Sequence, residues 1–360
     1  MCDRHRPRDN RESGEPAICF IIPPHIQEHL AGQAQTPAAR KRAIRQLASS
    51  SQVRGWRNAF FGGPAAVAGI TSVFAAGKER IVCDAHGTEH IPGTPIRREG
   101  QNPVVDHAVN EAYDGSGTTY DFYRQVFERD SIDGRGLDLL STVHYGTNYG
   151  NAFWNGGQMV YGDGDGEFFG SFTTCLDVIA HELTHGITQF SAGLVYQGQP
   201  GALNESFSDV FGVLVRQFSQ NQKAEDADWL IGAGLLIPKP GTHRQALRSL
   251  KAPGTAYDDP ELGSDPQPAH MKDYYQGFAD NQGVHINSGI PNHAFYLAAM
   301  ALGGYAWQTV GPVWYEALTT RLRPSSTFAD AAAATIAVAS QKGASVQSAV
   351  EEAWKSVGVI

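Results

Sequence analysis

The sequence predicts an α+β protein with two lobes, a strand-rich N-terminal lobe followed by a mainly helical C-terminal lobe. The first observation is length, because 360 residues exceed the usual size of one hydrophobic core. The second is the content of 40 glycines, which implies many tight turns and irregular loops. The third is a change of pattern near residue 173, where strand-like segments give way to the three-and-four apolar spacing of helices.

Residues 1–50 differ from the rest of the chain. They combine a charged start, the proline break at Pro23 and Pro24, and a basic helical pattern over 38–47. This arrangement predicts a detachable prosegment. We therefore expect three units, which are the prosegment 1–50, an N-terminal lobe 51–190 and a C-terminal lobe 191–360.

The elements of the two lobes follow from local patterns. In the N-terminal lobe we expect strands near 79–84 and 141–145 and one helix over 102–127. A helix over 174–190 should begin at Thr174 as cap, with Asp177 in its first turns, where an acid is favoured by the helix dipole. Later apolar periodicity predicts further helices at 202–220, 287–302, 309–322 and 327–342.

Composition excludes several classes of function. A formal net charge of −9 argues against nucleic acid as a partner, because binding to phosphates requires clustered positive potential. The basic cluster within 40–45 is better explained as a processing or linker segment. Four widely separated cysteines without a CxxC pair indicate neither a disulfide framework nor a zinc knuckle.

The chain also lacks clear membrane and export signals. No apolar run approaches the roughly 20 residues of a membrane helix, so we expect no membrane span. Residues 1–16 are polar and broken by proline, and the apolar run 17–22 is too short for a secretory signal. We expect either export by another route or a precursor that stays in the cytoplasm.

The strongest chemical signal is the run His181-Glu182-Leu183-Thr184-His185. Residues four apart lie one above the other on a helix, so His181 and His185 point to the same place with Glu182 beside them. A catalytic Zn²⁺ takes three protein ligands and leaves its fourth position to water. Glu205 is the best third ligand, and Asp209, on the same helix face, could accept the second ring N–H of His181.

With these residues, the chain resembles the thermolysin-like metallopeptidases. The resemblance continues through 151–154, 161–166 and 283–289 and covers roughly residue 100 to the end. It implies a zinc endopeptidase whose cleft and HExxH helix lie between the two lobes. A metzincin is excluded, because Ser191 stands where that class has its third histidine.

The resemblance also implies catalytic roles. Zinc would polarise the scissile carbonyl and acidify water, and Glu182 would take the water proton and pass it to the leaving amine. Tyr196 and His285 would stabilise the oxyanion of the tetrahedral intermediate. A histidine beside glycine can also be only a turn residue, but the context Gly-Val-His-Ile-Asn-Ser-Gly favours catalysis for His285.

By the same resemblance, Asn151 and Ala152 belong to an edge strand that pairs with an extended peptide, with Trp154 as support. Arg248 matches an arginine that binds a substrate carbonyl, and Arg244 is a nearby alternative. The resemblance also implies a preference for a bulky apolar residue just after the scissile bond, through four residues that would wall its pocket. Their alternative role is plain core: Phe169, Phe172, Val178 and Leu247.

The chain departs from the family pattern where relatives hold paired calcium ions. Asp177 and Asp228 match two calcium ligands, but Arg216 replaces an expected acid, and Leu230 and Ala233 replace two more. Calcium requires six to eight oxygen ligands, so we expect the paired site to be lost and Arg216 to pair with Asp177 or Asp228 instead. The loop 163–167 lacks the EF-hand glycine and distal glutamate and should be a turn.

The prosegment resembles the short inhibitory prosegments of the protealysin-like subgroup through 22–30, which includes Pro23, Pro24 and His25. We expect it to occupy the cleft in cis and to be removed near 48–52. Cys19 or His25 could donate directly to zinc, although a solvated tail with incidental Cys and His is the simpler explanation.

Two other functions compete with the endopeptidase. An aminopeptidase of the same zinc class would need a Gly-x-Met-Glu-Asn element to capture the substrate amine, and the sequence has none. A binding protein without activity would have no need for Glu182, Tyr196 and His285 together. We therefore expect a monomeric, bacterial-type enzyme acting on peptides and proteins, which a proteinaceous inhibitor could regulate.

Overall fold

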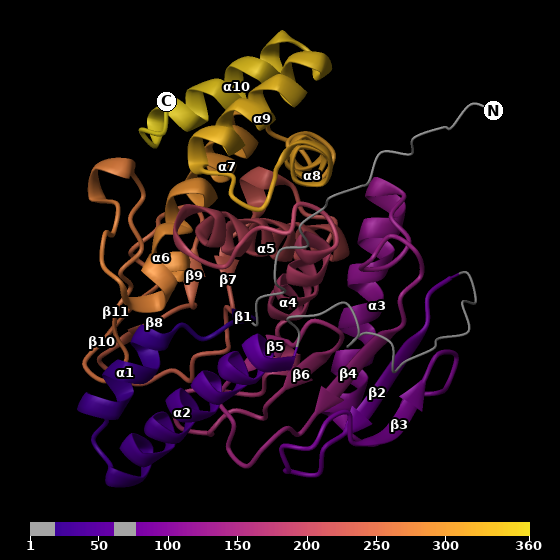
Figure 1. Ribbon diagram of the computed structural model, residues 1–360, viewed down its shortest axis with the longest axis vertical. Coiled ribbons are helices and arrows are strands. Elements are labelled where there is room, and N and C mark those ends of the chain that lie inside the picture. The colour runs from indigo at the N-terminus through magenta and orange to yellow at the C-terminus, as the bar shows by residue number, and fades with distance from the viewer. Residues whose placement is uncertain (1–18, 61–76) are drawn as a thin grey trace, which may run out of the picture.

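The computed structural model describes residues 19–60 and 77–360, with side chains for 20–49 and 77–360. It confirms the predicted α+β class with two lobes. Figure 1 shows the sheet at one end of the molecule, the C-terminal helices at the other, and helices α4 and α5 between them. Elements are labelled below as in that figure.

The N-terminal lobe is built on a six-stranded sheet with the order β1-β5-β6-β4-β2-β3. Strands β2, β4 and β6 run parallel, whereas β1, β5 and β3 pair antiparallel with their neighbours. The two expected strands are present as β2 and β4. The strand bounds are Cys19–Phe20 (β1), Arg80–Asp84 (β2), Thr94–Arg98 (β3), Leu139–Val143 (β4), Ala152–Trp154 (β5) and Met159–Tyr161 (β6).

Helix α3, His107–Phe127, packs on this sheet and begins five residues later than expected. Its start is set by Asp106, whose carboxylate accepts the backbone N–H groups of Ala108 and Val109. The side chain thus satisfies donors that a longer helix would have used internally. The expected extension to residue 102 was wrong for this reason.

Helices α4, Leu176–Gln189, and α5, Gly198–Ser219, pack against each other at the centre of the molecule. The expected cap Thr174 belongs instead to a short 3₁₀ turn, Phe172–Thr174, and Cys175 stands at the N-cap position of α4 without a capping side-chain hydrogen bond. Helix α5 begins four residues before the expected position 202. Helix α4 carries His181 and His185, and helix α5 carries Glu205.

The C-terminal lobe contains five α-helices in the described chain beyond α5. The helix expected at 309–322 is divided into α8 and a π-helical turn, Ala317–Arg321, and α10 was not expected. Thr327 caps α9 through a capping box with Asp330. The helix bounds are Ala279–Asn287 (α6), Gly289–Leu302 (α7), Gly311–Glu316 (α8), Phe328–Lys342 (α9) and Ala344–Ser356 (α10).

Short elements connect α5 to α6. Two small sheets form there, β7 with β9 and β8-β10-β11. The strand bounds are Leu230–Ile231 (β7), His243–Arg244 (β8), Arg248–Ser249 (β9), Tyr257–Asp259 (β10) and Gly263–Ser264 (β11). Two 3₁₀ turns lie in the same region, Ala224–Asp226 and Met271–Asp273.

The expected prosegment forms strand β1 and two helices, α1, Pro24–Gln33, and α2, Pro37–Phe60. Figure 1 shows both helices lying across the sheet and the lower part of the C-terminal lobe. The buried face of α1, Ile26 and Leu30, belongs to the same apolar cluster as α4 and α5. Helix α2 runs through residue 50, so the domain boundary there stays a prediction.

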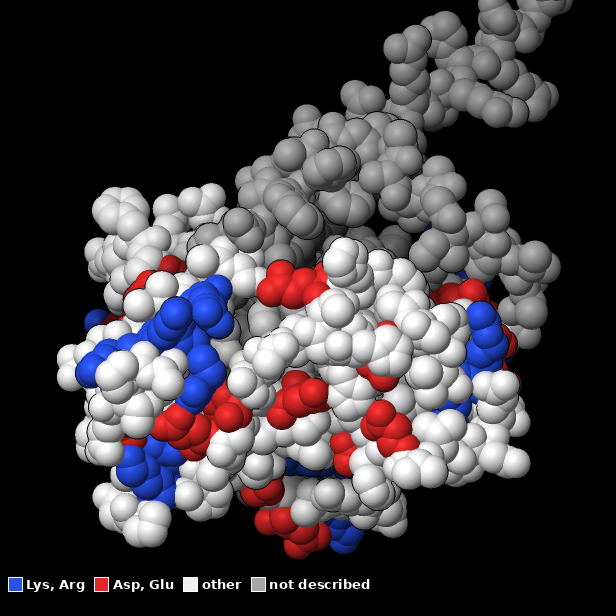
Figure 2. Space-filling view, turned by 90° about the horizontal axis from the view of Figure 1, so that it is seen from below, with Lys and Arg blue, Asp and Glu red and all other residues white. Residues whose placement is uncertain are grey.

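The described surface carries charges of both signs. On the face in Figure 2, the Lys and Arg patches are small and interrupted by acidic side chains. Cys83 and Cys175 are free and buried. Among the helices of the described ranges, none combines the length and apolar character needed to cross a membrane.

Candidate metal centre

Three side chains from α4 and α5 converge on one point in the core. The Nε2 atoms of His181 and His185 lie 3.0 Å apart, and each is 3.5 Å from a carboxylate oxygen of Glu205. All three residues are buried. The HExxH spacing places the two imidazoles one helical turn apart, and the crossing of α5 over α4 brings the carboxylate to them.

These residues fit a zinc ion. A tetrahedral site with zinc bonds of about 2.0–2.1 Å places its donor atoms about 3.3 Å apart, close to the three distances observed. His181 Nδ1 donates to Asp209 and His185 Nδ1 to Asn204, both at 2.8 Å. Both Nε2 atoms therefore present lone pairs to each other, an arrangement that a bound cation stabilises. Oε2 of Glu205 is buried without a hydrogen-bond partner in the described chain.

The residues that orient the ligands were only partly expected. Asp209 occupies the position proposed for it beside His181. Asn204 and Ser208, whose hydroxyl lies 3.0 Å from His185 Nδ1, were missed. Asn204 directly precedes Glu205 on α5 and Ser208 follows it by three residues. This closeness to the expected ligand is the signal that could have identified them.

The electrostatics of the centre follow from its burial. Burial lowers the pKa of His185 to about 3, so this imidazole is neutral at ordinary pH. Burial alone would raise the pKa of Glu205, but the nearby histidines, His285 first, outweigh it and lower the pKa. A neutral imidazole and an ionised carboxylate are the forms that bind metal.

Glu182 faces the same point but has different partners. Its Oε2 accepts the backbone N–H of Trp154 at 2.9 Å, whereas Oε1 has no hydrogen-bond partner in the described chain. Burial, together with the negative charge of Glu205, raises its pKa well above the usual value. His181, Glu182 and His185 also lie close enough to form a ligand set of their own. Glu205 is better placed than Glu182 to be the third ligand, because each imidazole Nε2 atom is 3.5 Å from one of its oxygens.

Tyr196 and His285 lie together on the other side of Glu205. The Tyr196 hydroxyl donates to Glu205 and lies 3.2 Å from His285 Nε2. Asp280, which was not expected at the site from the sequence, accepts the ring Nδ1–H of His285 at 2.6 Å and its backbone N–H at 2.8 Å. Burial opposes protonation, but the charges of Asp280 and Glu205 raise the pKa of His285 to about 8.

Arg248 is buried and makes a charged pair with Asp209. Its Nε and Nη2 atoms both donate to the Asp209 carboxylate at 2.8 Å, and Asn292, also missed, donates to it at 2.8 Å. The charge of Arg248 holds the pKa of Asp209 well below its usual value against the effect of burial. Arg244, the alternative, donates instead to Asp259 at 2.7 Å and is not part of this cluster.

Asn151 and Ala152 contact the prosegment. Strand β1 pairs with β5 in the register Phe20↔Phe153. The Ile21 N–H donates to Ala152 O at 3.2 Å, and the Ile22 N–H to Asn151 Oδ1 at 3.0 Å. Extended backbone therefore lies along the edge strand.

The inhibitory residues expected from the sequence lie just outside this segment. Pro23 stands at the N-cap position of α1, and Pro24 is the first residue of that helix. His25 bonds through Nε2 to the Tyr257 hydroxyl at 3.0 Å, so that nitrogen is not directed to zinc. The side chain of Cys19 lies outside the described residues. Phe20 and Ile21, rather than the proline pair, contact His285 and Arg248.

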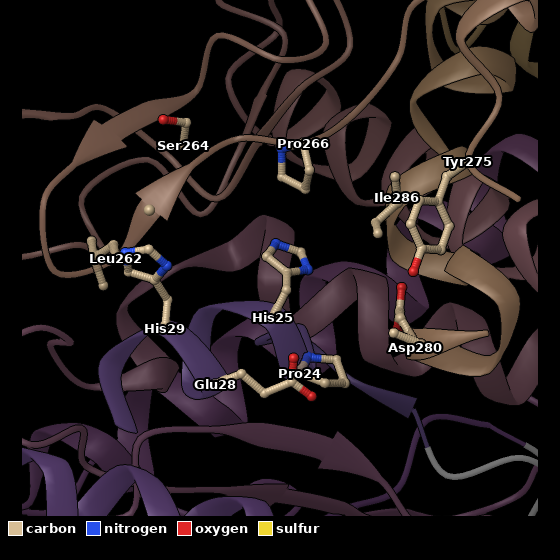
Figure 3. Close-up of a pocket in the computed structure, with 12 residues that line it drawn as sticks. Pro24, His25, Glu28, His29, Leu262, Ser264, Pro266, Tyr275, Asp280 and Ile286 are labelled. Atoms are coloured by element: carbon tan, nitrogen blue, oxygen red, sulfur yellow. The ribbon is translucent and has the colours of Figure 1, made fainter. Parts of the chain in front are cut away.

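A cavity of about 320 Å³ separates α1 from the C-terminal lobe. Figure 3 shows His25 and His29 projecting from α1 toward the segment with Ser264 and Pro266, with Asp280 on the other side. His25 is half-buried, yet its Nδ1 is shielded and without a hydrogen-bond partner in the described chain. Burial lowers the pKa of His25 to about 4.

The four apolar residues expected in the substrate pocket are all buried in the main apolar cluster: Phe169, Phe172, Val178 and Leu247. Ile21 belongs to the same cluster and is fully buried. Their role in selecting substrates stays a prediction.

Arg216 makes the ion pairs expected for it. It donates to Asp177 at 2.9 Å, to Asp228 and to the Leu230 carbonyl at 2.9 Å. It thus contacts both acids. In the loop 163–167, Asp165 accepts the N–H groups of Glu167, Phe168 and Phe169, which makes a tight turn.

Comparison with known proteins places this geometry in a family. Residues 82–189 match the catalytic domain of thermolysin metallopeptidases and 192–359 match their alpha-helical domain. An extracellular metalloprotease of Pectobacterium carotovorum is 53% identical over 78% of this chain and 81% of its own. Protease PrtS of Photorhabdus is 49% identical over 78% of this chain and 76% of its own. The solved precursor of protealysin from Serratia proteamaculans is similar with a TM-score of 0.85 and 47% identity, covering 95% of this chain and 100% of that one.

Proposed function

We propose, on the premise that this chain belongs to the thermolysin family of metallopeptidases, that it cleaves peptide bonds on the N-terminal side of bulky apolar residues. The chain is a zinc-dependent metalloendopeptidase that carries a propeptide. The proposal adds the substrate preference, the residue roles and restraint by the segment before about residue 50. It also places the enzyme outside the cell, as the name of the Pectobacterium relative states for that protein.

The residues divide the chemistry among them. Zinc held by His181, His185 and Glu205 would polarise the scissile carbonyl and lower the pKa of water. Glu182 takes the proton of the attacking water and passes it to the leaving amine, a role that its raised pKa favours. Tyr196 and His285 donate hydrogen bonds to the oxygen on which negative charge develops.

The observation that carries the proposal is the path of backbone from Phe20 to Ile22. Arg248 Nη1 donates to the Ile21 carbonyl at 3.2 Å, while Asn151 and Ala152 hold the neighbouring N–H groups. These are the contacts that recognition of an extended peptide by strand addition requires. A bulky apolar side chain, Ile21, is buried at the centre of this path.

The same contacts support restraint by the prosegment. Phe20, Ile21 and Ile22 use the edge strand, Arg248 and His285, so a second peptide cannot use them at the same time. Helix α1 holds the segment in place through Ile26 and Leu30, which are buried in the main core. Removal of the prosegment would therefore open the site.

Zinc content and chelator-sensitive cleavage of a blocked peptide series test this function. The chain shortened to begin near residue 52 should cut internally before bulky apolar residues, and the full chain should cut more slowly. Equal rates would contradict restraint, and cutting only from a free amino terminus would favour an aminopeptidase. Val178→Ala should change the preferred residue while zinc content is kept, and loss of zinc would show that Val178 has a structural role.

A further inference from the structure

The peptide bond between Phe20 and Ile21 lies against the groups proposed to stabilise the oxyanion. The Phe20 carbonyl oxygen accepts a hydrogen bond from His285 Nε2 at 3.0 Å. The same nitrogen lies 3.2 Å from the Tyr196 hydroxyl and 3.5 Å from Glu205, a metal ligand. Among the prosegment carbonyls whose hydrogen bonds are described, this one faces the metal centre.

The backbone groups of Ile21 and Ile22, on the other side of the bond, are also held by hydrogen bonds to the site. Ala152 O accepts the Ile21 N–H at 3.2 Å, and Arg248 Nη1 donates to the Ile21 carbonyl at 3.2 Å. Asn151 Oδ1 then accepts the N–H of Ile22 at 3.0 Å. Three consecutive residues are thus fixed by the site, with the Phe20–Ile21 bond between the oxyanion donors and the edge strand.

The side chains suit the proposed preference as well. Ile21, on the C-terminal side of the bond, is bulky, apolar and fully buried, and Phe20 is 3% exposed. An enzyme that cuts before bulky apolar residues would accept this pair. Such a bond in the cleft of its own enzyme is already at the effective concentration of an intramolecular reaction.

A cavity borders Phe20 in the precursor. A cavity of about 190 Å³ is lined by Phe20, Tyr196, Asp280 and His285, among others. A water molecule occupies roughly 30 Å³ of liquid, so the cavity has room for several. This open space lies on the side of the bond that carries Tyr196 and His285.

We propose that Phe20–Ile21 is a self-cleavage site, which the precursor cuts in cis as the first step of its maturation. The inference rests on the function proposed above. Water oxygen bonds to the Phe20 carbonyl carbon, the bond from that carbon to the Ile21 nitrogen breaks, and Glu182 transfers a water proton to that nitrogen. The products are a carboxyl group at Phe20, which ionises by losing the second water proton, and an amino terminus at Ile21.

The two products are held differently. In the described chain, the N-terminal product is held through the pairing of β1 with β5 and the contacts of Phe20. The product that begins at Ile21 stays attached through α1 and the covalent chain. The first cut would release the N-terminal piece, and removal near 48–52 would remain a separate event.

Intact mass and amino-terminal sequencing of the zinc-loaded full chain test the proposal. We expect a species that begins at Ile21 to appear before any later cut, at a fractional rate that does not change on dilution. Glu182→Gln should remain whole, also when mixed with the active chain. Ile21→Pro, which lacks the N–H that Ala152 accepts, should not be cut there. Ile44→Val, at an exposed position of α2, should be cut as the natural chain is.

Several outcomes would overturn it. Maturation without a species beginning at Ile21, or cutting of the Glu182→Gln chain by added active protein, contradicts a first cut in cis. The natural and Glu182→Gln chains decide this even if Ile21→Pro does not fold. If the sample matures without a species beginning at Ile21 but still cleaves a blocked peptide, the self-cleavage proposal fails while the proposed function holds. A sample that cuts neither itself nor the peptide contradicts the proposed function instead.

Discussion

The backbone N–H of Trp154 donates a 2.9 Å hydrogen bond to Oε2 of Glu182, which joins the edge strand β5 to helix α4. The same strand carries Ala152, which accepts the Ile21 N–H of the docked segment. The proposed base and the peptide are therefore positioned by one piece of backbone. The arrangement leaves Oε1 of Glu182 without a hydrogen-bond partner in the described chain and so available for a proton.

Replacing Glu182 by Gln should abolish proton transfer while preserving the structure. The Gln carbonyl can still accept the Trp154 N–H, and the three proposed metal ligands are unchanged. General acid–base catalysis contributes about 10²–10⁴ in rate, so kcat should fall by that order. Peptide hydrolysis by the processed enzyme, together with zinc content and Tm, measures the effect. Activity close to that of the natural enzyme would contradict the role of Glu182.

Asp209→Asn should weaken zinc binding. Asp209 accepts the Nδ1–H of His181 and also pairs with Arg248, so the change disturbs the ligand and leaves a buried guanidinium without its counter-charge. Loss of such an orienting carboxylate typically costs 10–100-fold in metal affinity. Competition with a chromogenic zinc chelator gives the affinity directly. Ser208→Ala is the matched control with a smaller expected loss, because Asn204 still accepts from His185.

Arg216 should replace calcium in stabilising the junction of α4 and α5. Removing it in Arg216→Met leaves the buried Asp177 with its Gly232 N–H but no positive partner. Breaking such a pair costs about 3 kcal/mol of unfolding free energy, measured by urea denaturation. Lys355→Met removes only exposed pairs with Glu351 and Glu352 and should leave the unfolding free energy nearly unchanged. A large rise in the Tm of the natural protein on adding calcium would contradict this role.

Docking of the prosegment should weaken in acid because of His25. The pKa of His25 is lowered by burial to about 4 in the docked state, against 6.5 for a free histidine. Above pH 6.5 both states hold the ring neutral and there is no effect. Between 6.5 and 4 the undocked state binds a proton that the docked state does not, so docking weakens by up to tenfold per pH unit.

Hydrogen exchange of residues 20–33 in the Glu182→Gln precursor measures this dependence. Protection should fall across that pH window in the natural sequence and much less in a His25→Gln chain. The groups that face His25 are the Tyr257 hydroxyl, Asp280, His285, Arg248 and His29. His29→Gln, one turn further along α1, is the matched control. Equal pH dependence with and without His25 would contradict the prediction.

The sequence predicted much of the fold because local patterns cause it. The apolar spacing of 176–189 and 198–219 specifies amphipathic helices, and the spacing of His181 and His185 depends only on helix geometry. Element ends were less accurate. The start of α3 depends on Asp106 as cap, and the π-helical turn after α8 leaves no clear pattern in the sequence.

The residues that support the site were harder to predict. Asp280 meets His285 only because residues 280–283 take positive φ angles and turn the chain back. Asn292 reaches Asp209 across 83 residues of sequence. Neither contact has a short-range signature, and each is decided by how distant elements pack.

By itself, the sequence determined the two-lobed α+β class, the helix that carries His181, Glu182 and His185, and the resemblance that points to Glu205, Tyr196 and His285. Only the tertiary structure decided that Phe20 and Ile21, rather than Pro23 and Pro24, contact His285 and Arg248. The reason is physical. Helical spacing is a local property of the chain, whereas the register of a short strand on an edge is set by the backbone it pairs with, here β5.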